Sequence, residues 1–197
     1  MLRFFSNREL SDKLSIPLAK WKRWAREFLP PDPLGGLQSG VTRQFSVDEA
    51  LIVFVGGHLV AELKASIPDV RQILADLIPH LRDIGFFANT RIHDRFRSGF
   101  DGPIRTFTIL ICRDRKASAL GAGFCYTLRG ELSRRSQEQN GRTVFLERYI
   151  EEQIPAATQS LPSPLSGRIL NVSALADFFV RALGLDSGHF PILNGRT

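Results

Sequence analysis

The feature that most constrains the fold is a short capped helix followed at once by a second helix. Ser6 and Glu9 have the spacing of a capping box, in which each side chain accepts from the backbone N–H of the other residue, and they predict a helix start. We expect this helix to end near Leu14 and a tight turn to follow. Pro17 predicts the start of the second helix, because the N–H it lacks has no partner at a first helical position. The second helix should end near Phe28.

The second helix has one apolar side and one basic side. Trp21, Trp24 and Phe28 share the apolar side, so we assign both tryptophans to packing. The other side carries four cations: Lys20, Lys22, Arg23 and Arg26. A short helix, a tight turn and a basic amphipathic helix are typical of a helix-turn-helix whose second helix reads DNA.

A loop and two further capped helices complete the first part of the chain. The proline- and glycine-rich residues 30–40 predict a loop, and residues 41–45 predict one strand of a small β-ribbon, with Arg43 near its tip. This basic ribbon would be a wing. Ser46 and Glu49 form a second capping box before an apolar helix, in which Gly56 and Gly57 indicate close contact with another helix. A fourth helix should begin after Ser66.

This order of elements, over about residues 3–80, resembles the winged helix-turn-helix head of MerR-family transcriptional regulators. The resemblance lies in the joint spacing of the two short helices, the wing, and residues 40–49 and 64–74. It implies a reading helix in the major groove of DNA and a wing on the DNA backbone. In the wing, Arg43 shortly before Phe45 matches the arginine that the family carries at this place. Family members continue into a long coiled-coil helix that pairs two subunits. No sustained heptad follows residue 84 here, so we expect the C-terminal part to hold a dimer together.

The second half of the chain is rich in strand signals. We expect four strands, at residues 106–112, 124–128, 143–146 and 168–172, with a hairpin turn at Asn140–Gly141. Residues 155–167 read as a linker, and Ser173 is expected to cap a closing helix that ends near Leu183. The predicted fold class is therefore α+β. A mostly helical winged helix-turn-helix domain (1–84) precedes a smaller α+β sensing or dimerisation domain (85–197) with about four strands.

Charge and composition narrow the range of partners. The net charge is +6, with net +4 in residues 1–45, net −3 in 46–84 and net +6 in 85–148. A net positive charge of this size favours a polyanion as the binding partner. Hydrophobic residues make up 43% of the chain, and no apolar run approaches the roughly 18 residues of a membrane span, so we expect a soluble cytoplasmic protein. Cys112 and Cys125 are expected to be reduced and structural.

The same sequence supports more than one function. We expect no catalytic residue, metal site or cofactor, because neither a nucleophile–base spacing nor a paired-carboxylate motif appears. The favoured hypothesis is a transcriptional regulator that binds double-stranded DNA as a homodimer, with residues 85–197 as the candidate site for a small-molecule or protein effector. An architectural DNA-binding factor of a phage or mobile element remains an alternative. So does an adaptor or enzyme whose helix-turn-helix mediates protein contacts. The Arg-rich segment 91–115 would extend the DNA footprint, bind an acidic effector or solubilise a sheet edge.

Overall fold

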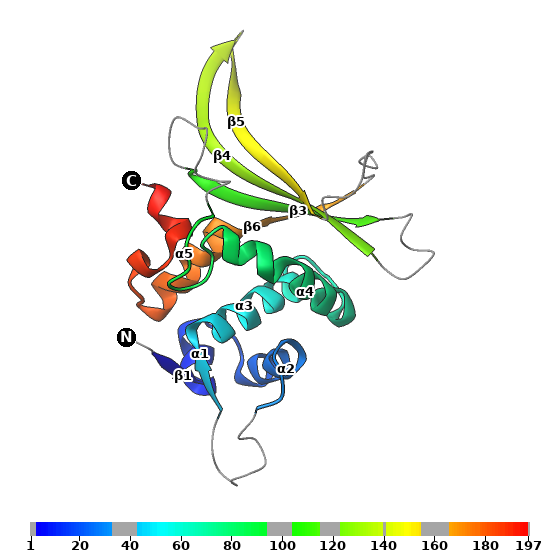
Figure 1. Cartoon of the computed structure of the whole chain (residues 1–197), viewed down its shortest axis with the longest axis vertical. Helices are drawn as coiled ribbons and strands as arrows, with labels where there is room; N and C mark the ends of the chain where they lie inside the picture. The colour runs from blue at the N-terminus through cyan, green and yellow to red at the C-terminus, as the bar shows by residue number, and fades with distance from the viewer. Residues whose placement is uncertain are drawn as a thin grey trace.

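A computed structural model of the chain describes residues 3–32, 43–93, 104–114, 123–139, 141–154 and 166–196. The protein is mixed α+β, as predicted, with the helices gathered on one face of an antiparallel sheet (Figure 1). The elements in chain order are β1 (Phe4–Ser6), α1 (Asn7–Lys13), α2 (Leu18–Phe28), β2 (Gln44–Ser46), α3 (Val47–Ala61), α4 (Ile67–Asp83), β3 (Thr106–Asp114), β4 (Gly123–Gln139), β5 (Arg142–Ile154), β6 (Arg168–Asn171), α5 (Val172–Leu183), and the 3₁₀ helices η3 (Ser187–His189) and η4 (Pro191–Arg196).

Helix α3 lies at the centre of the helical layer and is buried on most sides. Both halves of its predicted capping box are present, since Ser46 accepts from the Glu49 N–H and Glu49 accepts from the Ser46 N–H. The close contact expected at its glycines is confirmed. A Cβ atom at Gly56 would lie 2.5 Å from the Phe28 ring, and one at Gly57 would lie 2.2 Å from the Trp24 ring. The glycines therefore allow α2 to pack directly against α3.

A two-stranded ribbon precedes α1 and α3. The strand expected at residues 41–45 is observed as β2 at Gln44–Ser46, and its antiparallel partner is β1, with Phe5 opposite Phe45. No strand was expected at β1. Residues 33–42, which include most of the predicted wing loop, lie outside the described residues.

The second half forms a four-stranded antiparallel sheet in the order β5-β4-β3-β6. All four expected strands are present, although β4 and β5 are much longer than predicted. Their hairpin is confirmed by the pairing of Gln139 with Arg142 and by a φ of +71° at Gly141, while Asn140 lies outside the described residues. The strands predicted for residues 85–197, about four, are the four of this sheet, but the total differs from the prediction, because the described residues hold six strands with β1 and β2, and β1 was not expected. The linker expected at 155–167 falls mostly outside the described part.

The cap of helix α5 corrects a prediction. The helix ends at Leu183 as expected, but its N-cap is Asn171, whose side chain accepts from the Ala174 N–H. Ser173 is fully buried, and its hydroxyl oxygen accepts from the Phe107 N–H at 2.9 Å. Ser173 therefore joins α5 to β3 instead of starting the helix.

One hydrophobic core serves both halves of the chain. The inner face of the sheet, which includes Phe107 and Tyr126, packs against the helices. Phe54 of α3 stacks on Phe178 of α5 and meets the Phe179 ring at a tilt of 38°. The Tyr126 hydroxyl donates to Asp76 of α4 at 2.5 Å, which fixes the sheet to the helical layer. Within the described ranges, no helix combines the length and apolar character required to cross a membrane.

Candidate nucleic-acid interface

The turn between α1 and α2 is held by a single buried serine. The Ser11 hydroxyl donates to the Ile16 carbonyl at 2.7 Å, and the Ile16 N–H donates to the Ser11 carbonyl at 3.0 Å. Ser15 takes a left-handed φ of +54°, which reverses the chain within this turn. Pro17 is the N-cap of α2, whose first residue is Leu18, one position after the helical start that the sequence predicted. These bonds fix the angle at which α2 leaves α1.

Helix α2 buries its aromatic side, as predicted for packing. Trp21 is fully buried and meets Phe45 edge to face at 5.9 Å, while Trp24 is 5% exposed. The opposite side of the helix is solvent-exposed and carries the four predicted cations: Lys20, Lys22, Arg23 and Arg26. None of these four forms an ion pair with another described residue. A helix held rigidly by its aromatic side thus presents an unneutralised basic side to solvent.

The fifth predicted residue, Arg43, lies in a different environment. Its guanidinium donates to the Pro30 carbonyl at 2.9 Å and to Glu49 at 3.1 Å, and it lies over the Phe45 ring. The side chain is only 17% exposed. In this structure Arg43 therefore fastens the chain after α2 to the start of α3. The contact that the sequence analysis expected between Arg43 and DNA stays a prediction.

Glu49 is the acceptor that organises this junction. Its carboxylate accepts from the Ser46 N–H at 2.9 Å and the Ser46 hydroxyl at 3.0 Å, in addition to Arg43. Burial alone would raise the pKa of Glu49, but the bonds from Ser46 and Arg43 outweigh burial, so the pKa lies below its ordinary value of 4.5. The predicted capping box indicated the bond to Ser46. The link to Arg43 depends on the fold and had no local signal.

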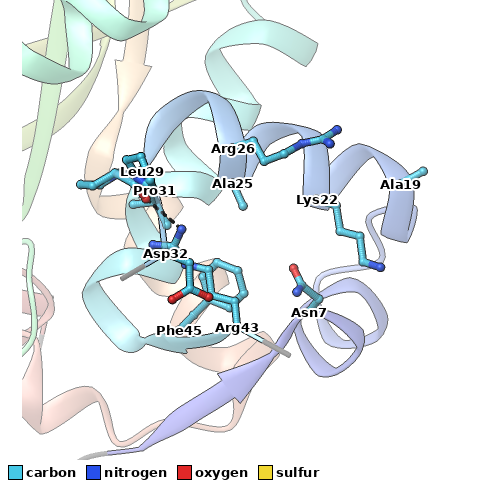
Figure 2. A pocket seen from close by; sticks show the side chains of 11 residues that line it. Asn7, Ala19, Lys22, Ala25, Arg26, Leu29, Pro31, Asp32, Arg43 and Phe45 are labelled. Atoms are coloured by element: carbon cyan, nitrogen blue, oxygen red, sulfur yellow. Dashed lines mark hydrogen bonds between the residues drawn. The ribbon is translucent and has the colours of Figure 1, made fainter. Parts of the chain in front are cut away.

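A hollow of about 650 Å³ lies between α2 and the chain around Arg43 (Figure 2). Lys22 and Arg26 line it from α2, with Asn7 of α1 also at its edge. Figure 2 shows the Lys22 side chain reaching down toward Asn7, while Arg43 lies beneath the α2 C-terminus. Cations and an amide along a concave surface are groups that bind phosphate oxygens. Asn7 was not predicted as a site residue, because its only signal in the sequence is its place as the first residue of a capped helix.

A smaller hollow, of about 290 Å³, lies where the N-terminal ribbon meets the C-terminal 3₁₀ helices. Asp48, Arg3 and His189 are among the residues that line it. The Asp48 carboxylate accepts from the Ala88 N–H at 3.1 Å. Burial raises the pKa of Asp48 above its ordinary value, although the Ala88 bond and Arg82 oppose this effect.

Two described arginines of the Arg-rich segment 91–115 contact residues of α4 and β4. Arg113 pairs with Asp69 at the start of α4, at 2.6 Å, and Arg105 extends β3 through its backbone bond to Glu131. Arg95, Arg97 and Arg115 lie outside the described residues.

The two cysteines are free thiols that lie opposite each other on β3 and β4. Burial raises the pKa of Cys112, with Cys125 adding to the effect, which keeps the thiol protonated.

Three comparisons with known proteins identify no relative of this chain. No family model, no curated protein and no solved structure matches the chain.

Proposed function

We propose that the protein binds duplex DNA as a sequence-specific transcriptional regulator of the MerR type. In this proposal α1, α2 and the β1–β2 ribbon act as a winged helix-turn-helix, with α2 in the major groove. The observation that carries the proposal is the exposed basic side of α2, whose four cations have no acidic partner among the described residues. The same side of α2 also carries Glu27, but its carboxylate pairs with Arg71 of α4 at 2.6 Å and not with any of the four cations.

The positions of the cations suggest different tasks. Lys22 and Arg26 line the 650 Å³ hollow, which suits contacts to the phosphate backbone. Lys20 and Arg23 lie outside that lining and are the candidates for base edges. Arg43, bonded to Pro30 and Glu49, acts in this proposal by holding the base of the wing in place.

The salt dependence of DNA binding tests the proposal. Each neutralised phosphate contributes about −0.9 to the slope of log K against log salt, so Lys22 and Arg26 together give about −1.8 per head, and any phosphate contact of Lys20 or Arg23 makes the slope steeper. Fluorescence anisotropy with a labelled duplex measures this slope. The variant Lys22→Ala/Arg26→Ala should reduce its magnitude by about 2. Arg181→Ala is the matched control, because Arg181 is an exposed cation on α5 that pairs with Asp177.

Specificity separates the regulator from its alternatives. After selection of a preferred site from random duplexes, Arg23→Ala or Lys20→Ala should weaken that site by about 1–3 kcal/mol more than random DNA, if the residue reads a base. A selection that yields no consensus sequence would favour an architectural factor. A flat salt response, or an equal loss in the Arg181→Ala control, would contradict DNA binding through α2 and would favour the adaptor.

A further inference from the structure

The β4–β5 hairpin extends well beyond the rest of the sheet. The pairing of β3 with β4 ends at Thr106 and Glu131, and beyond a register shift between Glu131 and Ser133 the two strands pair only with each other, from Ser133–Arg148 to Gln139–Arg142. We call residues 133–148 the arm. Figure 1 shows the arm rising from the sheet, on the side of the molecule opposite α1 and α2.

The arm exposes large apolar side chains without a core beneath them. Leu146 is 55% exposed, and Tyr149, just below the arm, is 47% exposed. A two-stranded hairpin is marginally stable in water unless further strands or a packed face support it. A projecting arm that carries exposed apolar residues therefore gains stability by covering them against another surface.

The outer edge of β5 is open in the described part of the chain, where β5 pairs with β4 alone. β5 spans 13 residues without a proline, so its outward N–H and C=O groups remain available for another strand. An edge of this length is suited to β-sheet extension by a second chain.

The charges along β5 favour a second copy that runs antiparallel. Arg142 stands at the arm's tip, whereas Glu151, which already pairs with Arg129 of β4 at 2.7 Å, and Glu152 stand at the base of the strand. In an antiparallel pair the basic end of each β5 lies beside the acidic end of the other, and a two-fold axis repeats this match. In a parallel pair, like charges would meet.

The same symmetry restricts the register. In a symmetric antiparallel pair, one residue must lie opposite its own copy. Among the exposed residues 146–149, Glu147 and Arg148 would each face their own charge, which destabilises a cross-strand pair, and of the two uncharged residues Leu146 is the more exposed, at 55% against 47% for Tyr149. A pair centred on Leu146 covers the apolar side chain that the arm exposes.

We propose that two copies of the chain pair through the outer edges of β5, antiparallel and centred on Leu146, so that their sheets become one. Because the arm lies opposite α2, both basic helices stay free. The open edge of β5, its charges and the exposed Leu146 support the interface independently of DNA binding. Only the role of the interface, which is to hold two DNA-binding heads together, rests on the proposed function.

The molar mass in solution tests the pairing without DNA. Light scattering after size exclusion, from 1 to about 100 µM protein, should give the mass of a dimer that dissociates on dilution. Leu146→Asp should give the monomer mass at all these concentrations, because it buries two opposed carboxylates at the axis. Ile169→Asp is the matched control, since Ile169 is an exposed apolar residue (67%) on the other edge strand, β6, and it should leave the dimer intact.

A cross-link tests the register even if Leu146→Asp disturbs the hairpin. In a Cys112→Ser/Cys125→Ser background, Leu146→Cys should give a covalent dimer on mild oxidation, and Ile169→Cys should give little. A monomeric wild-type chain at 100 µM, or a dimer that survives Leu146→Asp, would overturn the proposal. So would a monomer whose DNA affinity falls with Leu146→Asp, because the arm would then be a DNA contact. A dimer with no DNA binding would reject the proposed function alone.

Discussion

At the scale of single residues, Glu49 links the start of α3 to the chain that follows α2. It caps α3 through Ser46 and accepts from Arg43, whose other bond goes to the Pro30 carbonyl after α2. One carboxylate thus sets the start of the central helix and also the position of the chain that follows the basic helix.

The lowered pKa of Glu49 makes the stability of this junction depend on pH. A carboxyl group whose pKa is lower when folded stabilises the protein above its ordinary value, here 4.5, and this contribution disappears as pH falls through the folded value. Glu49→Gln should therefore lower the free energy of unfolding by about 1 kcal/mol at pH 7, the net value of such a bond. The difference from wild type should shrink below pH 4.

Urea unfolding at pH 7 and at pH 3 measures this difference. Glu138→Gln is the control, because Glu138 is an exposed carboxylate on the arm, and it should change stability little at either pH. If Glu49→Gln lowers the free energy of unfolding equally at pH 7 and at pH 3, packing and not the ionised carboxylate stabilises the junction.

Residue-scale predictions from the sequence hold where the signal is local. The serine caps and the burial of Trp21 and Trp24 follow from spacings of three or four residues, and the structure confirms them. The bonds of Arg43 could not be predicted, because its partner Pro30 is brought near by the fold. Ser173 was misassigned as a cap for a similar reason: β3 pairing provides its hydroxyl with a competing backbone donor.

At the scale of elements, the contact between α2 and α3 depends on two glycines. Gly57→Ala would place a methyl group 2.2 Å from the Trp24 ring, a rigid group that cannot move aside without displacing α2. We expect a loss of about 1–3 kcal/mol, the usual cost of overpacking, although alanine is the better helix former. Thermal unfolding measures the loss, and Gly188→Ala, which meets only the flexible Asp186 carboxylate at 3.3 Å, is the control. An unchanged or higher melting temperature would contradict this account of the helix contact.

The lengths of β4 and β5 show where element prediction fails. The sequence indicated strands at 124–128 and 143–146, where apolar residues concentrate, but the observed hairpin extends through charged and polar residues on both sides of Gln139. An arm exposed on both faces lacks the apolar–polar alternation on which strand prediction depends. The partner of β2 was missed as well, because β1 has only three residues.

At the scale of the whole molecule, the boundary predicted at residue 84 crosses a continuous core. Phe86 and Phe87 are fully buried just beyond it, and the Ala88 N–H is bonded to Asp48 of α3. Phe54 of the first half stacks on α5 of the second. The division into a head and a C-terminal domain stays a prediction, but the two parts share their apolar surfaces.

This shared core determines what a fragment of residues 1–84 should do. Removing residues 85–197 would expose Phe54, which packs on Phe178 and Phe179 of α5, and would take the buried Phe86 and Phe87 out of the core. At about 1.5–3 kcal/mol for each buried aromatic side chain, the loss is comparable with the whole stability of a typical domain. We expect the fragment to lack a cooperative thermal transition by circular dichroism and to bind DNA far more weakly than the full chain. The control is the full chain with Ile169→Asp, which changes an exposed residue and should melt as wild type does. A fragment that melts within a few degrees of the full chain would instead establish residues 1–84 as an independent domain.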